Sequence, residues 1–589
     1  EIFSSAAGGE GVSLVDVIDK CSSPMGARML RSTLAMPLLD IRELEARYDV
    51  VGHFVEQQDD LGSLQVHIGE LGDLERILSR AAVGKIVPRE VMQLGRALSQ
   101  MDPVRELCSG KGVEELDRMM GQMKNCDRIL EKIRCTMDAE PASAIGKGKV
   151  IADGVDPELD ELRDISSGGK GYLQQMQERE AERTGITSLK IGYNNVFGYY
   201  IEVRNTHKDK VPEDWVRKQT LVNAERYITE ELKEYEEKIL SAEGKIYELE
   251  SRIYWALVEE IRSNVREIQT DCQILARLDV LAGFAELASG SGYCRPEMNK
   301  GLVLDIRAGR HPVIEKMMGP GEEFVPNDVY LDSKQQQIII LTGPNMAGKS
   351  ALLRQTALIC LIAQIGCFVP AKSVKMGIVD KIFTRVGASD NISRGESTFM
   401  VEMLESATIL NNLSERSLIL LDEIGRGTST FDGMSIAWAI VEHLQGRACH
   451  PKTLFATHYH ELTVMEQELP GVRNFNIAVK KRKDDVIFLR KIVRGAADDS
   501  YGIEVAKLAG LPTKVTSRAK ELLTELEAQS RAEKAAHQAK LAEESQGQIS
   551  FFADAEAQVI QQLSKTHVGE LSDAECRELL LDLANLLHQ

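Results

Sequence analysis

The spacing of hydrophobic residues predicts that the chain is mainly helical from its start to about residue 160. Apolar side chains three and four positions apart mark one helix face: Ile41, Leu44, Tyr48, Val51 and Val55. Asp40 and Glu43 form a capping-box-like start for that helix. Asp156-Pro157 predicts a second helix start, because an N-cap residue precedes a proline. The Ser166 to Gly171 stretch, SSGGKG, is expected to interrupt or loosen this second helix.

The hydrophobic period changes between residues 189 and 203, LKIGYNNVFGYYIEV. β-branched and aromatic residues with Asn-Asn and Gly between them predict a small insert of strands that ends at about Leu221. Helical spacing then returns and predicts a helix from Asn223 to Ser263, roughly 60 Å long at 1.5 Å per residue. Its apolar stripe consists of Ile228, Leu232, Tyr235, Ile239, Ile246, Leu249, Ile253, Leu257 and Ile261. Two long helices that flank a small insert indicate an arm with a tip.

From about Gly292 onward, short apolar runs alternate with helical patterns. The runs QQIIILTG, RSLILLDE and KTLFATH are continuous, which is typical of buried parallel strands. This part of the chain is therefore predicted to be an α/β domain. After about Glu521 the composition shifts to Ala, Glu, Lys and Gln, which predicts a helix, a linker and a short terminal helix from Ser572.

Composition and charge exclude several classes of protein. The chain has 589 residues and a net charge of 71 − 90 = −19, which argues against a protein that coats nucleic acid with its whole surface. Hydrophobic residues make up 43%, too many for a disordered chain, and no apolar stretch reaches the ~20 residues of a membrane span. The ten cysteines contain no CxxC pair, so we expect reduced thiols in a cytoplasmic protein. The first residue is Glu1 and not Met, so we expect a fragment of a longer protein.

The most specific motif is G-x-x-x-x-G-K-[ST], which the chain matches in full with Gly343, Pro344, Asn345, Met346, Ala347, Gly348, Lys349 and Ser350. It follows a strand-like run and precedes a helical pattern, as a phosphate-binding loop requires. The glycines let backbone N–H groups approach phosphates, and the helix N-terminus favours negative charge. Lys349 is expected to meet the β- and γ-phosphates of ATP, and Ser350 to bind Mg²⁺. The alternative is an ordinary Gly-rich turn.

A second motif, SLILLDE, is an apolar strand that ends in Asp422 and Glu423. Asp422 is expected to hold Mg²⁺ through water, and Glu423 to orient or activate the attacking water. An apolar strand that ends in two carboxylates is often only structural, but its place after a full phosphate-binding loop favours catalysis.

A third apolar strand, Thr453 to Ala456, is followed by Thr-His-Tyr-His. His458 is expected to sense the γ-phosphate by donating a hydrogen bond. A zinc site at His458 and His460 is one alternative, although no third ligand is evident nearby. A structural histidine is the other alternative.

These motifs, with GESTFMVEM at residues 395–403 and DEIGRGTST at 422–430, closely resemble the MutS family of DNA mismatch-repair ATPases in its bacterial type. RMLRSTLAMPLLD resembles the start of the family's core and lever, and DDSYGIEVAKLAGLP its helix-turn-helix. KIGYNNVFGYYIEV and KQTLVNAERYITEELKEYE resemble its DNA clamp and returning lever. The resemblance therefore covers nearly the whole chain.

The resemblance implies a multidomain fold: an α-helical core and lever with a small β-rich clamp insert, then an α/β P-loop NTPase (ABC-like) domain and a helical C-terminal tail. The implied boundaries are 1–164 for the first part of the core and lever, 165–230 for the clamp, 231–296 for the returning lever helices, 297–520 for the ATPase domain with a dimerising helix-turn-helix near 495–520, and 521–589 for the tail and linker.

The resemblance also implies roles that spacing alone cannot give. Family members pair their ATPase domains, so Ser397 is expected to reach the nucleotide of the partner subunit in trans; an ordinary capped helix start is the alternative. Phe324 resembles the aromatic residue that stacks on adenine, with a core phenylalanine as the alternative. The implied protein partners are a second copy of the chain, in a homodimer or a tetramer, and a MutL-type repair protein.

DNA contact by the clamp rests mainly on the resemblance. Between Lys190 and Arg226, seven basic and five acidic residues give a net charge of 7 − 5 = +2, which a solvated surface would also show. Contacts to the DNA backbone, sensitive to salt and independent of sequence, are expected from Lys190, Arg204, Lys208, Arg217 and Lys218.

The family's mismatch reader is a Phe-x-Glu segment in an N-terminal domain, which together with the connector domain would precede Glu1. Two similar segments, Phe54-Val55-Glu56 and Phe284-Ala285-Glu286, fall inside helical patterns. We expect both phenylalanines to be packing residues, so the chain as given is not expected to read mismatches.

We therefore expect a MutS-like, Mg²⁺-dependent ATPase that clamps double-stranded DNA as a dimer and couples ATP binding and hydrolysis to DNA gripping and repair signalling. A family paralogue that binds DNA junctions without reading mismatches is the alternative. A transporter-like or cohesin-like ATPase would carry an LSGGQ-like segment, in whose place this chain has GESTFMVEM.

A last motif lies in the tail. Gln548, Phe551 and Phe552 resemble the short peptide by which bacterial replication and repair proteins dock on the sliding clamp. Two adjacent aromatic side chains can fill an apolar pocket on a partner. The alternative is that both aromatic residues begin a small amphipathic helix or pack on the ATPase domain.

Overall fold

The computed structural model describes residues 2–4, 11–194, 198–319, 321–344, 347–386, 398–482, 485–496 and 501–526, with isolated positions from 574 to 581. The chain divides into two compact units. The first unit comprises Glu1–Thr342, Gly348–Ala478 and Leu489–Ala496. The second unit comprises Gly343–Ala347, Val479–Phe488 and Ala497–Gln589.

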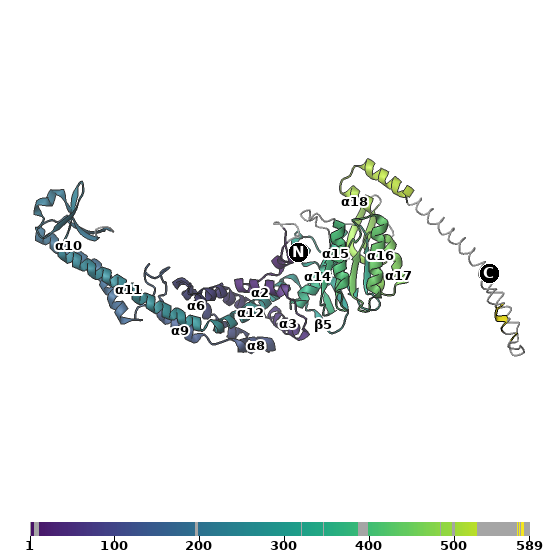
Figure 1. Ribbon diagram of the computed structural model, residues 1–589, viewed down its shortest axis with the longest axis horizontal. Helices are drawn as coiled ribbons and strands as arrows, with labels where there is room; N and C mark the ends of the chain where they lie inside the picture. Colours follow the sequence, from purple (N-terminus) through teal and green to yellow (C-terminus); the bar gives the residue numbers. More distant parts are fainter. Residues whose placement is uncertain are drawn as a thin grey trace. The chain divides into compact units, whose positions relative to one another are not determined.

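The first unit begins with short helices, as the hydrophobic spacing predicted (Figure 1). Their bounds are α1 (Leu14–Ile18), α2 (Pro24–Ala35), α3 (Ile41–Glu56), α4 (Gln58–Leu71), α5 (Leu74–Ala82), α6 (Pro88–Leu98), α7 (Met101–Cys108), α8 (Glu114–Gln122) and α9 (Asp127–Thr136). The predicted start of α3 is confirmed, because the Asp40 side chain accepts a hydrogen bond from the Arg42 N–H. The predicted apolar face of α3 packs inward, with Leu44, Tyr48 and Val51 buried.

A single later helix, α12 (Val265–Ser291), packs against α2, α3, α4 and α5. Every residue from Leu278 to Ala285 is buried, so this part of α12 packs on all sides and can contact several helices. A buried carboxylate, Asp279, accepts hydrogen bonds from the backbone N–H groups of Ser22 (2.8 Å) and Ser23 (2.9 Å). This contact anchors the start of α2 on α12.

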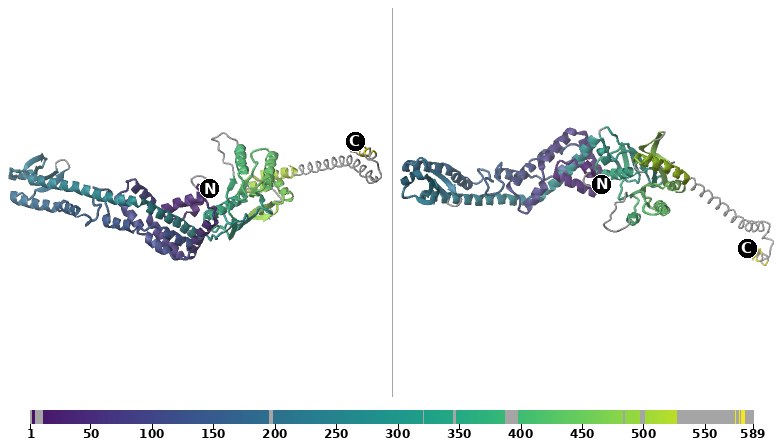
Figure 2. Two further views of the ribbon diagram at one scale, coloured as in Figure 1. Left: turned by 60° about the horizontal axis from the view of Figure 1, so that its bottom comes forward. Right: turned by 90° about the horizontal axis from the view of Figure 1, so that it is seen from above.

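The helix α10 runs from Pro157 to Thr184, and Asp156 caps it by accepting from the N–H groups of Glu158 and Leu159. The expected interruption at residues 166–171 is wrong, because the backbone stays helical through that stretch. Packing against α11 (Glu230–Ser263) outweighs the low helix propensity of the glycines there. The two further views in Figure 2 also show α10 and α11 side by side.

Four antiparallel strands lie between α10 and α11 in the sequence, in the order β1-β2-β4-β3. They are β1 (Lys190–Asn194), β2 (Gly198–Arg204), β3 (Val216–Thr220) and β4 (Ala224–Ile228), with the 3₁₀ helix η1 (Asn205–Lys210) between β2 and β3. The expected insert end at Leu221 and helix start at Asn223 are wrong. Tyr227 is buried against Trp215, with ring centroids 5.9 Å apart, so residues 224–228 complete the sheet. Helix α11 begins only after Thr229, whose side chain accepts from the Leu232 N–H.

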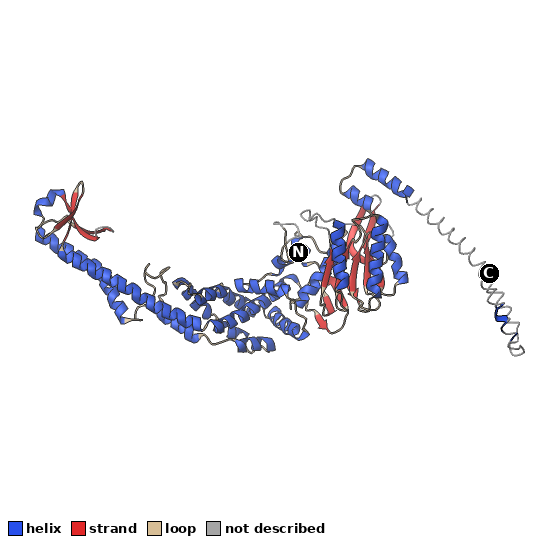
Figure 3. Ribbon diagram, in the orientation of Figure 1, coloured by secondary structure: helices blue, strands red, loops and turns tan. Residues whose placement is uncertain are grey.

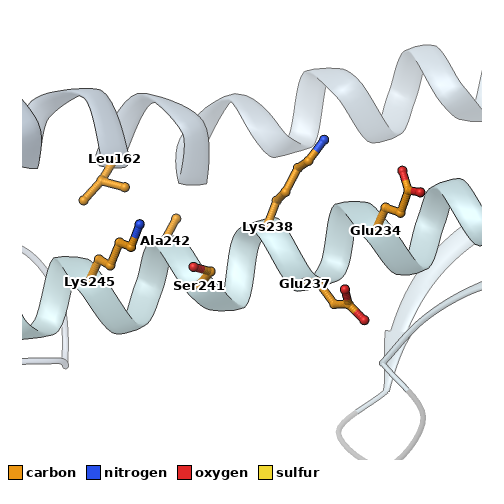
Figure 4. Close-up of a pocket in the computed structure, with 7 residues that line it drawn as sticks. All are labelled: Leu162, Glu234, Glu237, Lys238, Ser241, Ala242 and Lys245. Carbon is orange, nitrogen blue, oxygen red and sulfur yellow. The ribbon is translucent and has the colours of Figure 1, made fainter.

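A hollow of about 460 Å³ lies between α10 and α11 (Figure 4). Leu162 of α10 and Ala242 of α11 point toward each other across it. Its rim carries both signs of charge, including Glu234 and Lys238, so it favours neither an anion nor a cation. We assign it no function.

From Glu297 to Arg494 the chain forms a mixed α/β region, as predicted (Figure 3). Its larger sheet has the order β10-β11-β12-β8-β13-β14, and the first five strands pair in parallel. The strands are β8 (Ile338–Thr342), β10 (Ile382–Arg385), β11 (Leu418–Asp422), β12 (Lys452–Ala456), β13 (Val472–Arg482) and β14 (Asp485–Arg494). A smaller sheet, β5-β9-β6-β7, consists of β5 (Glu297–Asn299), β6 (Leu304–Gly309), β7 (Asn327–Leu331) and β9 (Ser373–Gly377).

Helices cover the larger sheet on both faces. Residues of α15 (Thr398–Asn411) and α16 (Thr430–Gly446) share a buried core with Ile338, Ile340 and Phe455. Residues that alternate with these along the strands are buried on the opposite face. There α14 (Lys349–Gln364) packs against β11 and β12. The remaining elements are α13 (Pro312–Met317), η3 (His460–Val464) and α17 (Met465–Glu468).

The second unit contains α18 (Gly502–Leu508) and a helix over residues 513–526, joined by a turn at Gly510. These helices fall where the helix-turn-helix was expected. Within this unit the rings of Phe488 and Tyr501 meet edge to face, 6.4 Å apart. Of the predicted terminal helix from Ser572, isolated positions between 574 and 581 are described, and these are helical; the peptide at Gln548 lies outside the described residues.

Among the described residues, every cysteine is a free thiol. In the same part of the chain, the helices are too short or too polar to cross a bilayer.

Candidate nucleotide-binding site

Three neighbouring parallel strands bring the sequence motifs to one edge of the larger sheet. In the register, Asp422 at the end of β11 lies opposite Ala456 of β12, and Ala456 lies opposite Leu341 of β8. The phosphate-binding loop follows β8, Glu423 follows β11, and His458 follows β12. Carboxyl ends of parallel strands form the usual ligand site of an open α/β sheet.

The phosphate-binding loop joins β8 to α14, as its motif requires. Gly343 and Gly348 adopt φ values of +132° and +110°, which side-chain-bearing residues rarely adopt. Lys349 is the first residue of α14, so the N–H groups and the positive dipole end of a 16-residue helix lie at the end of the loop, an arrangement that favours an anion. Asn345 and Met346 lie outside the described residues.

Lys349 and Glu423 meet at the centre of the site. The Lys349 side chain is only 3% exposed, and its Nζ lies 3.8 Å from Oε1 of Glu423. The other oxygen of Glu423 pairs with Arg426 at 2.6 Å. Burial lowers the pKa of the Lys349 ammonium, and the carboxylates of Glu423 and Asp422 oppose that shift. The charges of these two acidic groups therefore favour the protonated form of the buried lysine.

Glu423 has a strained backbone. Its φ is +55°, which is unusual for a residue with a side chain, and its N–H donates to the Ala456 carbonyl at 2.9 Å. Strain of this kind persists only where the surroundings fix it, and it gathers at functional sites. Here β12 fixes it and turns the carboxylate toward Lys349.

Asp422 suits a divalent cation. Among the described residues, no group donates a hydrogen bond to its buried Oδ1 atom. A buried carboxylate oxygen without a donor is costly, and a Mg²⁺ ion or its bound water would satisfy it. Ser350, directly after Lys349, supplies the hydroxyl that the motif expects. The residues present therefore fit this ion.

His458 lies at the end of β12, with its ring 4.1 Å from that of Tyr459. Partial burial, followed by the charges of Arg426 and Lys349, lowers the pKa of its imidazole from the ordinary value of 6.5. The ring is thus neutral at pH 7 and can donate one hydrogen bond. The zinc alternative finds no support, because no cluster of three or more metal-ligating side chains occurs in the described part of the chain.

Glu402 contacts the loop after Glu423, although the sequence motifs alone do not indicate it. It lies on α15, is 5% exposed, and its Oε1 accepts from the Gly425 N–H at 2.5 Å. Arg385 approaches its other oxygen at 3.4 Å. The signal in the sequence is an acidic residue inside the apolar string FMVEM. Glu402 thus holds the loop that follows Asp422 and Glu423.

Gly425 and Gly433 let the loop after Glu423 pack closely on the start of α16. A Cβ atom added at Gly433 would lie 2.2 Å from the Gly425 carbonyl oxygen and 2.5 Å from the Tyr459 hydroxyl. Gly425 itself has φ +92°, and its carbonyl accepts from the Tyr459 hydroxyl at 3.0 Å. Since all these groups are buried, the position of Glu423 depends on this contact.

Phe324 and Ser397 are not brought to the site by any described contact. Phe324 lies, partly buried, in the segment before β7. That segment is held to β14 by hydrogen bonds to the carbonyls of Pro326 and Arg490. Ser397 lies outside the described residues, as do Gln548, Phe551 and Phe552.

The expected DNA-contacting side chains are exposed on the β-rich insert: Lys190, Arg204, Lys208, Arg217 and Lys218. Two of them are partly neutralised, because Lys208 and Arg217 pair with Glu225 at 3.0 Å and 3.3 Å. The two candidate reader phenylalanines, Phe54 and Phe284, are each 1% exposed, which confirms the prediction that they are packing residues.

At the carboxyl edge of the parallel sheet, the structure places the Lys349 ammonium, within the G-x-x-x-x-G-K-[ST] pattern, 3.8 Å from the Glu423 carboxylate. Comparisons with known proteins identify the family. Residues 1–285 match the model of MutS domain III, and residues 339–527 match that of MutS domain V. The chain belongs to the MutS family.

Curated relatives are similar in sequence to most of the chain. It is 56% identical over 517 residues to the DNA mismatch repair protein MutS of Flavobacterium psychrophilum, which covers 88% of this chain and 60% of the relative. It is 52% identical over 588 residues to the protein of that name from Parabacteroides distasonis, covering 98% and 67%. The match to that of Phocaeicola vulgatus is 54% over 586 residues, again 98% and 67%. The chain thus spans 60% to 67% of the length of these relatives.

Proposed function

We propose that this chain binds and hydrolyses ATP and uses that cycle to control how its β-rich insert grips duplex DNA in mismatch repair. The observation that supports this most is the meeting of Lys349, Asp422 and Glu423 at one edge of the sheet. The names of the relatives support repair as the setting. Because these relatives come from bacteria, the proposal places the chain in the cytoplasm of a bacterium.

Each residue of the site has one task in this proposal. Lys349 neutralises the β- and γ-phosphates, and Glu423 orients the attacking water and accepts its proton. Neutral His458 donates a hydrogen bond to the γ-phosphate. Ser350 and Asp422 would hold Mg²⁺, which supplies charge neutralisation at the phosphates when bound. Phe324 contributes an aromatic surface for the adenine ring.

The wider proposal concerns partners. Two copies of the chain pair through the helix-turn-helix formed by α18 and residues 513–526, and Ser397 of one copy completes the nucleotide site of the other. The α/β region then works as an ABC-like ATPase, and its closure is passed to the insert by α10, α11 and α12. A MutL-type protein receives the signal, and the tail docks on the sliding clamp.

The test of ATP use compares two lysine variants of the purified chain. Lys349→Ala should lose ATP binding and turnover, because the buried ammonium is removed. Lys334→Ala, at an exposed position, changes the charge equally and should behave as the unaltered chain. Chelation of Mg²⁺ should stop turnover. Equal turnover in both variants would contradict the proposal.

The test of DNA binding is the dependence of affinity on salt. Replacing exposed Lys190, Arg204 and Lys218 by alanine should flatten the plot of log affinity against log salt by about 0.9 for each lost phosphate contact. A control with the same loss of charge, at exposed Lys85, Arg89 and Lys147, should leave the slope unchanged. An unchanged slope in the first variant would contradict DNA gripping by the insert.

The same titration separates the two DNA-binding functions. With Phe54 and Phe284 buried, the chain as given should bind matched and mismatched duplexes almost equally. A clear preference for a four-way junction over both duplexes would favour the paralogue, which the names of the relatives do not favour. A clear preference for a mismatch would show that some other segment of this chain reads it.

A further inference from the structure

The helix that starts at the phosphate-binding loop is held at its other end by distant residues. α14 begins at Lys349 and ends at Gln364, and its last carbonyl groups have no partner within the helix. Three backbone carbonyls there accept hydrogen bonds from the N-terminal helical region. The donors are the Tyr48 hydroxyl to Ala363 O (2.6 Å), the Leu38 N–H to Gln364 O (2.7 Å) and Arg47 Nη1 to Ile365 O (2.7 Å).

The Gln364 side chain adds a second set of bonds at the same point. Its Nε2 donates to the carbonyls of Leu38 (3.0 Å) and Val379 (2.9 Å), and its Oε1 accepts from the Val379 N–H (2.8 Å). Gln364 is 3% exposed, so each of these bonds is shielded from water. One side chain thus joins α14, the segment before α3, and the strand region after β9.

Directly after α14 the backbone turns at Gly366, and the Arg47 side chain packs against this glycine. Gly366 has φ +88°, and a Cβ atom there would be 2.4 Å from Cδ of Arg47. The positive guanidinium also faces the negative end of the α14 dipole. Arg47 and Tyr48 are adjacent on α3, so one turn of α3 covers the whole end of α14.

We propose that Tyr48, Arg47 and Gln364 form a coupling joint, through which movement of the phosphate-binding helix α14 is transmitted to α3 and the helical core. The inference rests on the proposed ATP binding at Lys349. It adds the residues through which a movement of α14 would act on the helical core. All three are positioning residues, because none of them is part of the phosphate-binding loop or of the carboxylate pair.

The size of the expected displacement indicates that α3 must move together with α14. A helix of 16 residues is about 24 Å long, so a tilt of about 5° at the phosphate end moves the far end by about 2 Å. Hydrogen bonds of 2.6 to 2.7 Å do not survive a stretch of that size. Either several buried bonds break together, or α3 moves with α14. Burial of the unpaired groups makes the second outcome favourable.

Tyr48→Phe is the most selective probe of the joint. It removes one hydroxyl and keeps the ring, which is fully buried and packs near Phe368. Ala363 O retains a bond from the Gly366 N–H at 3.0 Å, so the end of α14 stays capped. The matched control is Tyr254→Phe, whose buried hydroxyl donates to the Ile86 carbonyl at 2.8 Å within the helical core.

Hydrogen–deuterium exchange of the whole chain, with and without a non-hydrolysable ATP analogue, tests the joint. In the unaltered chain, the analogue should change exchange both at the start of α14 and over residues 38–56. In Tyr48→Phe, the change at the start of α14 should remain, while most of the change over residues 38–56 should be lost. Tyr254→Phe should match the unaltered chain.

Gln364→Glu is a second probe, because it keeps the oxygen that accepts from Val379 and loses both donations. It should repeat the effect of Tyr48→Phe. Full transmission in both Tyr48→Phe and Gln364→Glu, or an equal loss in Tyr254→Phe, would overturn the joint. No analogue-dependent change at the start of α14 in the unaltered chain would instead contradict ATP binding itself, so the two failures are distinguishable.

Discussion

Gly433→Ala tests whether close packing behind the catalytic loop controls hydrolysis. The added methyl group would lie 2.2 Å from the Gly425 carbonyl oxygen, whereas ordinary contacts begin at 3.4 Å. The backbone of α16 and the loop must therefore separate by about 3.4 − 2.2 = 1.2 Å. Gly425 is two residues after Glu423, so this displacement reaches the carboxylate.

The expected cost is in turnover and not in ATP affinity. A misplacement of about 1 Å at a reacting group can cost about 100-fold in rate. The phosphate-binding loop is not displaced, so the dissociation constant for ATP should stay within about threefold. Alanine in place of glycine within a helix adds about 1 kcal/mol of helix propensity, which opposes any general unfolding.

The control is Gly446→Ala on the same helix, where an added Cβ meets nothing within 4 Å. It gains the same helix propensity without the clash, and its kcat should stay within about twofold of the unaltered chain. Steady-state ATP hydrolysis and titration with a fluorescent ATP analogue measure the two quantities. Equal kcat values for Gly433→Ala and Gly446→Ala would refute the reasoning.

Three further predictions concern Ser397, the tail peptide and the ionisation of His458. Mixing Ser397→Ala with Lys349→Ala subunits should restore activity, because one of the two composite sites becomes undamaged; heterodimers without recovery would contradict action in trans. A tail peptide of residues 541–560 should bind a bacterial sliding clamp in fluorescence anisotropy, and Phe551→Ala with Phe552→Ala should abolish it; equal binding would make these aromatics packing residues. Because the pKa of His458 is lowered, kcat should show no His458-dependent inflection at or above pH 6.5; such an inflection, absent in His458→Asn, would contradict this.

The parts of the site that the sequence predicted are local in the chain. The phosphate-binding loop, the Asp422-Glu423 strand end and His458 each follow an apolar strand, and the parallel register then brings them to one edge. Their positions could be inferred because the carboxyl ends of neighbouring parallel strands always share an edge.

The parts that sequence reasoning missed depend on contacts between distant residues. Glu402 holds the loop by accepting a hydrogen bond from the Gly425 N–H. Gly433 is needed because Gly425 and Tyr459 leave no room for a side chain there. The sequence predicts helix over residues 224–228, where the structure has a strand, because Ile228 continues the apolar spacing of α11. Burial of Tyr227 beside Trp215 decides the matter, and that contact has no local signal.

The central claim is that Glu423 orients the water that attacks ATP. Single-turnover hydrolysis by Glu423→Gln, alongside ATP-binding titration, tests it most directly, because glutamine keeps the size of the side chain and loses its charge. The account predicts ATP binding close to that of the unaltered chain and a rate of hydrolysis lower by about 100-fold or more. Hydrolysis by Glu423→Gln at a near-normal rate would contradict it.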